Sequence, residues 1–313
     1  MERLGFIMTE LLNGQKWLDT DGNVIHAHGG HMLFHDGWYY WYGEDRRGDN
    51  YVACYRTKDF RDFEFRGDII TTSTPTAPIR VRTTLALTGK DAEGNVHKVN
   101  LERPKVLYCE YTKKFVLWCH YENGLNYDDA RCAVATSDYP DRDFVYHGSF
   151  NPFGDMARDC TLYKDDDGRA YFIAASRGNA DLHIWRLTKD FLSTDKLVSS
   201  LFQNEYREAP AVFRKDGKYY MLSSYCTGWA PNQGKWSCAD SIDGDWEILE
   251  NFGDETTFDS QPAFVLERDG KFIYVGDRWG GKGEKYFDST YIVLPIKFDA
   301  GKPYIEFDEK AGF

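Results

Sequence analysis

Residues 36–42 read DGWYYWY, a turn signal followed at once by an aromatic strand. Asp-Gly readily adopts the positive φ values of a tight hairpin turn, and aromatic side chains favour strands. The same signal returns at the start of 167–173, 216–222 and 269–275, and a similar run without it occupies 114–118. A recurrence of about 50 residues is typical of the blades of a β-propeller.

Further strands follow each of the first four runs, as one antiparallel sheet per repeat requires. Second strands are expected at 51–55, 131–135, 182–187 and 234–239, and third strands at 63–65 and 143–146. Helix-period patterns are almost absent. Five such sheets arranged radially predict an all-β fold, a five-bladed β-propeller.

The longest interruption, residues 68–100, is rich in Thr, Pro and Gly and separates the first repeat from the second. We expect it to form an extended loop over one face of the propeller. We find no convincing linker, so residues 1–313 are predicted to form a single propeller domain.

The 313 residues carry a net charge of −12 and no run rich in Lys or Arg. This charge argues against nucleic-acid and anionic-membrane partners and favours a neutral substrate. The 21 tyrosines and nine tryptophans suit a sugar-binding surface, since a pyranose face stacks on aromatic rings, although strands also favour aromatics. No run approaches the roughly 20 apolar residues that span a bilayer.

The seven cysteines are odd in number, show no CxxC pairing and mostly lie in strand-like runs. They are expected to be small buried hydrophobic residues of a reduced protein. The residues after Met1 lack the regions of a signal peptide. A cytoplasmic location is therefore expected, and the alternative is an exported protein whose leader is absent from this sequence.

Two acidic residues stand directly before predicted strands. Asp159 precedes the run 160–164, and Glu208 opens an apolar strand, which should place its side chain near the mouth of the central channel. Glycoside hydrolysis needs one carboxylic acid to protonate the departing sugar oxygen and other groups to tune it and handle water. The two carboxylates therefore predict an enzyme, against the alternative of an exposed Glu at a strand end.

The segments around these acids carry a family resemblance. Residues 158–163 (RDCTLY) with 165–171 (DDDGRAY), and 208–213 (EAPAVF) with 217–220 (GKYY), resemble glycoside hydrolase family 43. The resemblance implies a five-bladed, inverting enzyme with three carboxylates, in which Glu208 is the general acid and Asp159 tunes its pKa and orients it. The general base, usually an Asp on the first inner strand, has no counterpart in residues 24–31 (VIHAHGGH).

A narrower resemblance spans nearly the whole chain. Residues 17–30 (WLDTDGNVIHAHGG), 41–44 (WYGE), 102–106 (ERPKV), 227–232 (TGWAPN) and 260–262 (SQP) look like the exo-β-1,3-galactanase subfamily, subfamily 24. This resemblance implies exo-acting release of galactose from β-1,3-galactan, as in arabinogalactan backbones, with a β-linked galacto-oligosaccharide as substrate. It also implies that Gln261 occupies the water-activating position.

An amide is a very poor proton acceptor compared with a carboxylate. Gln261 is therefore expected to hold the water and pass its proton through an imidic-acid tautomer or to a neighbour. Asp259 is a second candidate for the base, because on an extended strand it shares a face with Gln261; a turn residue is the alternative. The acid and the water site should be about 6.5–9.5 Å apart.

The subfamily resemblance also implies a pocket for the terminal galactose. The residues implied to line this pocket are Glu44, Glu102, Tyr127, Thr227, Trp229 and Asn232. Carboxylates that bind adjacent hydroxyls and a stacking Trp are what such a pocket requires. The alternatives are structural: an ion pair of Glu102 with Arg103, and a loop anchored by Trp229.

His26, His28 and His31 invite a metal site, because alternate residues of a strand face one side and imidazole is a common metal ligand. No matching carboxylate or cysteine spacing accompanies them. We therefore predict no metal and no cofactor, and expect these histidines to line the central channel.

Two other functions stay open. Pocket residues rather than the fold decide the sugar, so arabinofuranosidase or xylosidase action within the same family is one alternative. The other is a carbohydrate-binding propeller without catalysis. The absent base favours this second alternative, and the intact motifs around Asp159 and Glu208 oppose it.

Overall fold

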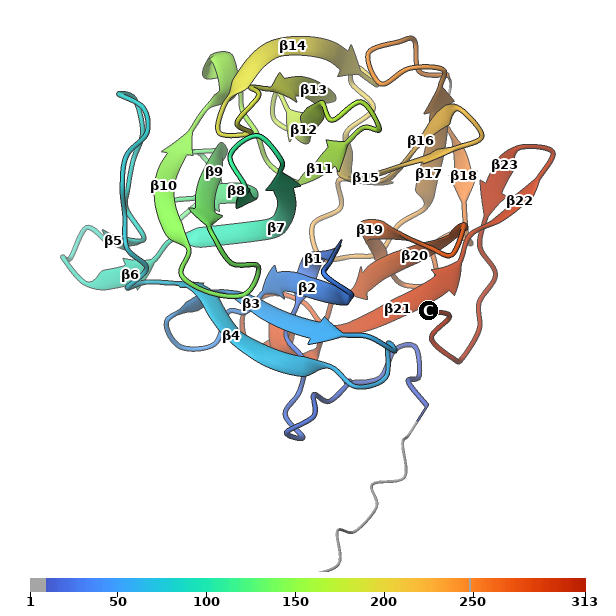
Figure 1. The fold of residues 1–313 in the computed structure, drawn as a ribbon, viewed down its shortest axis with the longest axis horizontal. Coiled ribbons are helices and arrows are strands. Elements are labelled where there is room, and N and C mark those ends of the chain that lie inside the picture. The colour runs from blue at the N-terminus through green and yellow to red at the C-terminus, as the bar shows by residue number, and fades with distance from the viewer. Residues whose placement is uncertain (1–9, 248) are drawn as a thin grey trace, which may run out of the picture.

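The computed structural model describes residues 10–247 and 249–313. Five sheets surround a central axis (Figure 1), so the predicted all-β, five-bladed propeller is confirmed. Helical structure in these residues consists of two short 3₁₀ turns, η1 Pro152–Gly154 and η2 Gly283–Asp288. No helix in this part of the chain has the length and apolar character needed to cross a membrane.

Each blade is an antiparallel sheet whose strands follow chain order. The blades are β1 His28–His35, β2 Trp38–Glu44, β3 Asn50–Thr57 and β4 Glu64–Thr71; β7 Asn100–Cys109, β8 Lys114–Glu122, β9 Arg131–Ser137 and β10 Val145–Phe150; β11 Cys160–Lys164, β12 Ala170–Ser176, β13 Asp181–Leu187 and β14 Thr194–Leu201; β15 Arg207–Lys215, β16 Lys218–Tyr225, β17 Gly234–Ala239 and β18 Glu250–Phe252; and β19 Gln261–Arg268, β20 Lys271–Arg278 and β21 Thr290–Pro295. A further ribbon joins β22 Lys297–Asp299 to β23 Lys302–Tyr304.

The first strands of the blades, β1, β7, β11, β15 and β19, contact one another around the axis. Residues from the starts of three of these strands line one cavity, and residues nearer the ends of all five line another. We call the end of the axis at which these strands begin the site end, and the opposite one the far end.

Asp-Gly turns join the first two strands of three blades, as predicted. The φ values are +48° and +78° for Asp36 and Gly37, +50° and +84° for Asp216 and Gly217, and +52° and +71° for Asp269 and Gly270. Two successive positive φ values match the twist of a hairpin. The Asp-Gly pair at 167–168 lies instead in a longer turn, in which Gly168 has a φ of +82°.

Five clusters of buried apolar side chains hold neighbouring blades together, one at each interface. Trp41, Trp118 and Trp185 are the largest fully buried side chains. Burying such a side chain contributes about 1.5–3 kcal/mol. All seven cysteines lie in the described residues as free thiols and six of them are buried, as expected for small hydrophobic residues.

Both ends of the described chain fasten the outer edge of the fifth blade. The backbone N–H of Val293 in β21 donates to Asn13 Oδ1 (2.8 Å), and Gly14 N–H donates to the carbonyl of Tyr291 (2.8 Å). From the C-terminal side, Gly312 N–H donates to the carbonyl of Val293 (2.9 Å). The N-terminal segment then continues into β1, so the ring is closed between its last blade and its first.

The interruption at 68–100 is not a simple loop over a face. Residues 68–71 belong to β4, and β5 Thr88–Lys90 pairs with β6 Val96–Lys98. The segment between lies along β10, where Ala77 N–H donates to the carbonyl of Tyr146 (2.9 Å). An outer strand presents unpaired backbone groups, and the segment covers this edge.

Candidate active site

The predicted catalytic side chains gather at the site end. Glu208 is the second residue of β15 and Gln261 the first of β19, while Asp159 directly precedes β11. All three line a cavity of about 260 Å³. Its other walls come from Glu44, Arg46, Glu102, Arg103, His120, Tyr127, Arg158, Asn179, Cys226, Gly228, Trp229 and Trp279.

Irregular backbone marks the strands that carry these groups. The pairing shifts register just after Glu102 in β7 and just after Glu208 in β15. The next residues, Arg103 and Ala209, have φ values of +51° and +52°. A left-handed conformation costs a non-glycine residue about 1–2 kcal/mol. Bulges of this kind re-aim side chains beside functional sites.

Glu208 is a buried carboxyl with the properties of a general acid. It is 7% exposed. Its Oε1 accepts from Gln261 Nε2 (2.9 Å) and its Oε2 from Asn179 Nδ2 (3.3 Å). Burial, and then the nearby charge of Asp159, raise the pKa of Glu208 to about 7. The carboxyl can therefore keep its proton near neutral pH and give it to a leaving group.

Asp159 is held by a buried arginine. Its Oδ2 lies 2.7 Å from Arg103 Nε, and the side chain is one-fifth exposed at the cavity wall. The alternative of an ion pair between Glu102 and Arg103 is wrong: Glu102 pairs with Arg46 (Oε1 to Nη2, 3.0 Å). The bulge explains the difference, since it turns two residues adjacent in sequence toward different partners.

Gln261 is fixed by four hydrogen bonds. Its Nε2 donates to Glu208 Oε1 and to Ser224 Oγ, both at 2.9 Å, while its Oε1 accepts from Trp279 Nε1 (2.8 Å) and from an Arg103 Nη2–H. Indole and guanidinium nitrogens only donate, which sets the orientation of the amide. Gln261 thus contacts the acid directly, so these two side chains do not show the separation of about 6.5–9.5 Å expected between the acid and the water site. The role of Gln261 toward water stays a prediction.

Glu102 is an ionised carboxylate on the cavity wall. Tyr127 Oη donates to its Oε1 (2.7 Å), and Arg46 bridges it to Glu44, with Nη2 2.8 Å from Glu44 Oε2. Burial alone would raise the pKa of Glu102, but Arg46 and His120 lower it to about 2. Three residues predicted to bind the sugar, Glu44, Glu102 and Tyr127, therefore meet in one network.

His120 is clamped between two carboxylates, with Nδ1 3.3 Å from Glu102 Oε2 and Nε2 2.9 Å from Glu122 Oε1. Burial lowers its pKa, but the two carboxylates outweigh burial and raise the pKa to about 9. Ligand atoms of Glu102, His120 and Asp159 lie within 4.8 Å of one another. A protonated imidazole and the three arginines on the same walls disfavour a metal ion there.

Aromatic rings form another wall. Trp229 meets Trp279 edge to face at 5.5 Å, Trp279 stacks on Tyr286 at 5.9 Å, and the Arg46 guanidinium lies 4.4 Å from the Tyr286 ring centroid. The apolar face of a pyranose can stack on such a surface. Trp279 was missed from the sequence because it follows β20, outside every motif considered.

Thr227 and Asn232 are not among the residues that line this cavity. Thr227 Oγ1 donates to the carbonyl of Ala230 (2.6 Å), and Asn232 Nδ2 donates to Thr227 Oγ1 (2.7 Å) and to the carbonyl of Tyr225 (2.7 Å). Asn232 lines a smaller neighbouring cavity of about 130 Å³. The two side chains brace the loop that carries Trp229.

The hypothesis that Asp259 is a base on the same strand face as Gln261 is wrong. Asp259 is exposed, precedes β19 and has a φ of +59°, so it lies in a turn. Its backbone N–H donates to Thr256 Oγ1 (3.0 Å), as a turn residue's would.

The three histidines do not share one site: His26 and His28 meet edge to face, with ring centroids 6.0 Å apart, but His31 lies elsewhere. His28 Nδ1 lies 3.0 Å from Asp277 Oδ1 and its ring stacks on Tyr291, while the ring of His26 packs edge-on against Phe287. A register shift separates His28 from His31, which lines the far-end cavity instead. The irregular backbone defeats the alternation on which a shared ligand face depends.

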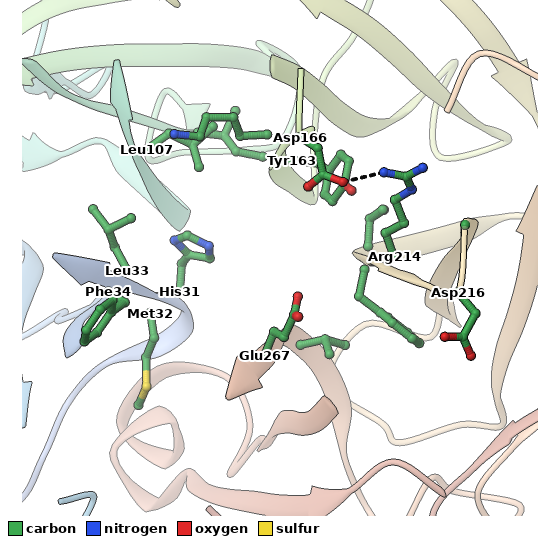
Figure 2. A pocket seen from close by; sticks show the side chains of 16 residues that line it. His31, Met32, Leu33, Phe34, Leu107, Tyr163, Asp166, Arg214, Asp216 and Glu267 are labelled. Carbon is green, nitrogen blue, oxygen red and sulfur yellow. Dashed lines mark hydrogen bonds and ion pairs between the residues drawn. The ribbon is translucent and has the colours of Figure 1, made fainter. Parts of the chain in front are cut away.

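The far-end cavity is larger, about 620 Å³ (Figure 2). His31, Arg214 and Glu267 are among its lining residues, and Arg214 pairs there with Asp166. None of the predicted catalytic residues lines it. Volume alone therefore does not identify the site. A shifted pKa alone does not either, because burial lowers the pKa of His31 in the far-end cavity to about 3. The smaller cavity is distinguished by its buried carboxyl groups, Glu44, Glu102 and Glu208.

A propeller with a buried carboxyl that titrates near neutrality, inside a carboxylate-rich and aromatic cavity, has the parts that a glycoside hydrolase needs. The sequence profile of Glycosyl hydrolases family 43 matches residues 106–279, more than half of the chain. The chain belongs to this family. No match was found among curated proteins.

Solved structures agree with this assignment. An exo-β-1,3-galactanase from Clostridium thermocellum is 40% identical, with a TM-score of 0.84, over 95% of this chain and 65% of that one. A β-1,3-galactosidase of the family bound to galactodeoxynojirimycin is 33% identical, with a TM-score of 0.83, over 97% of this chain and 100% of that one. An exo-β-1,3-galactanase from Phanerochaete chrysosporium with β-1,3-galactotriose is 31% identical, with a TM-score of 0.83, over 96% of this chain and 67% of that one.

Proposed function

We propose that this protein is an inverting, exo-acting glycoside hydrolase that releases galactose from β-1,3-galactan. The observation that carries the proposal is Glu208, a buried acid with a pKa of about 7 beside a sugar-sized cavity. The 40% identity to an exo-β-1,3-galactanase over 95% of the chain supports the choice of sugar and linkage.

In the proposed reaction the terminal galactose lies between the carboxylates and the aromatic wall. Glu44, Glu102 and Tyr127 bind its hydroxyls, and Trp229 contacts its apolar face. The Glu208 proton moves to the glycosidic oxygen as the bond from that oxygen to the anomeric carbon breaks. Water forms the new bond from the opposite side, which inverts the anomeric carbon.

Gln261 is proposed to orient that water and to accept or pass on its proton. All four of its hydrogen-bonding positions are occupied by Glu208, Ser224, Trp279 and Arg103. One of the two bonds to Oε1, from Trp279 or from Arg103, has to be exchanged for the water, because the amide nitrogen only donates and only the amide oxygen can accept the proton of water. Q261A should lower kcat by about 10²-fold. A variant that keeps most of its turnover would remove Gln261 from the mechanism.

Proton NMR of the reaction with β-1,3-galactotriose tests the proposal, with E208Q as the matched inactive control. Galactose appearing first as the α-anomer is expected. First appearance of the β-anomer would exclude inversion. Parallel assays with aryl arabinofuranoside and xyloside test the rival specificities, and binding without turnover of any substrate would favour the carbohydrate-binding alternative.

The remaining expectations are also proposals. A cytoplasmic location rests on the odd cysteine count and is tested by cell fractionation. The absence of nucleic-acid and membrane partners rests on the net charge of −12. Binding to duplex DNA or anionic vesicles at physiological salt would contradict it.

A further inference from the structure

One buried arginine touches most of the proposed machinery. Arg103 is 3% exposed. Its Nε lies 2.7 Å from Asp159 Oδ2, its Nη2 donates to Gln261 Oε1, and its Nη1 donates to the carbonyl of Pro262 (2.9 Å). The planar fork of a guanidinium can hold these partners at once, which a lysine cannot.

The backbone of Arg103 is held as firmly as its side chain. Its N–H donates to Glu44 Oε1 (3.0 Å), and its carbonyl faces the buried Lys105 Nζ (3.4 Å). Lys105 Nζ also donates to the carbonyl of Gly29 in β1 (2.6 Å). These contacts fix Arg103 at its strained φ of +51°. A strained backbone conformation of this kind is kept only where several surrounding contacts hold the residue in place.

We propose that Arg103 is a positioning residue that ties the modulator Asp159 to the water-handling Gln261, so that both are presented to Glu208 in one fixed arrangement. This inference rests on the proposed function, because it assigns Arg103 a part in that reaction. Neither the acid motifs nor the residues predicted from the sequence to bind galactose include it.

The charge of Arg103 also acts on the acid. The charged and titratable groups facing Glu208 are Asp159, Arg103, Arg207 and Cys226. Burial and Asp159 raise the pKa of Glu208, while Cys226 and Arg103 lower it. Loss of the guanidinium should therefore raise the pKa of Glu208 further, and the high-pH decline of activity should move upward.

The test compares R103K and R103M, with R66M as a matched control. Arg66 pairs with Asp141 and is not among the residues that line the cavity. R103K keeps the positive charge and loses the planar fork. Its kcat should therefore fall about 10²-fold, while KM changes by less than about threefold. The high-pH limb of its pH–rate profile should not move. R103M should lose as much kcat and shift that limb upward. R66M should match the wild type in both.

Titration of the Glu208 carboxyl by ¹³C NMR, assigned by its loss in E208Q, gives a readout independent of turnover. A higher Glu208 pKa in R103M supports the coupling, and an unchanged pKa overturns it. If R103M does not fold, R103K decides: kcat within about threefold of wild type would overturn the fork's role. If the wild type hydrolyses no galactoside, the proposed function fails, and the titration still judges the coupling.

Discussion

The two ends of the propeller axis are built from the same five inner strands, yet they differ in backbone and in charge. At the far end, β1, β15 and β19 keep regular register into Asp-Gly turns, and charged groups such as Asp216 and Glu267 are exposed (Figure 2). At the site end, the register breaks after Glu102 and Glu208, and the carboxylates are buried.

This difference separates stability from chemistry. Regular hairpins and apolar blade interfaces account for a stable ring of sheets. Left-handed residues occur at both ends, in the Asp-Gly turns as well as at Arg103 and Ala209. Register shifts inside the inner strands and buried carboxylates are unfavourable for folding, and they lie where a proton has to be moved. Substitutions at the site end should therefore change turnover far more than stability, and substitutions at the far end should do the reverse.

The largest effect is expected for E208Q. The amide is isosteric with the carboxyl but cannot protonate the leaving oxygen, so kcat on β-1,3-galactobiose should fall by about 10³-fold. Steady-state kinetics with released galactose as the readout checks this. E267Q at the far end is the control and should match the wild type. A comparable loss in E267Q would erase the distinction between the two ends.

D159N should have the next largest effect, about 10²-fold in kcat, because Arg103 loses its ionised partner and the acid loses its orientation. The neighbouring charge of Asp159 helps to raise the pKa of Glu208 to about 7. Without that charge, protonated Glu208 should be lost at lower pH, and the high-pH limb should move down. A pH–rate profile measures the shift, and an upward movement would contradict it.

The stability of E208Q should exceed that of the wild type at high pH. Folding raises the pKa of Glu208 from 4.5 to about 7. The contribution of Glu208 to the free energy of unfolding is therefore fully present below pH 4.5 and is lost as the pH rises through about 7. Glutamine avoids this loss, which amounts to at most about 3 kcal/mol. Urea unfolding at about pH 4 and pH 8 should show the gap opening at the higher pH. A gap independent of pH would rule out Glu208 as its source.

The sequence was sufficient for the far end and for part of the site. Asp-Gly pairs and aromatic strands are local signals, and they predict the hairpins and hence the five blades. Glu208 and Asp159 could be singled out because each stands at or just before the start of a strand, in a segment with a family resemblance; their catalytic roles stay predictions. The pairing of Arg103, the bracing role of Thr227 and the wall formed by Trp279 depend on bulges and on loops distant in sequence, which no local pattern specifies.

The smallest effect is expected at a far-end turn. Gly217 has a φ of +84°, and an added Cβ would meet no atom within 4 Å. G217A should therefore cost only the strain of a left-handed alanine, about 1 kcal/mol, with kcat unchanged. Thermal unfolding and kinetics on the same preparation check this. A loss of turnover would show that the far end is coupled to the reaction.

The role of Glu208 as the general acid is tested most directly by varying the leaving group. Wild type and E208Q are compared on aryl β-galactosides from good to poor leaving groups and on β-1,3-galactobiose. Acid catalysis matters most where the departing oxygen is most basic. The account predicts that E208Q retains much of its activity on the best leaving group and loses almost all of it on the disaccharide. An equal loss across the series would contradict it.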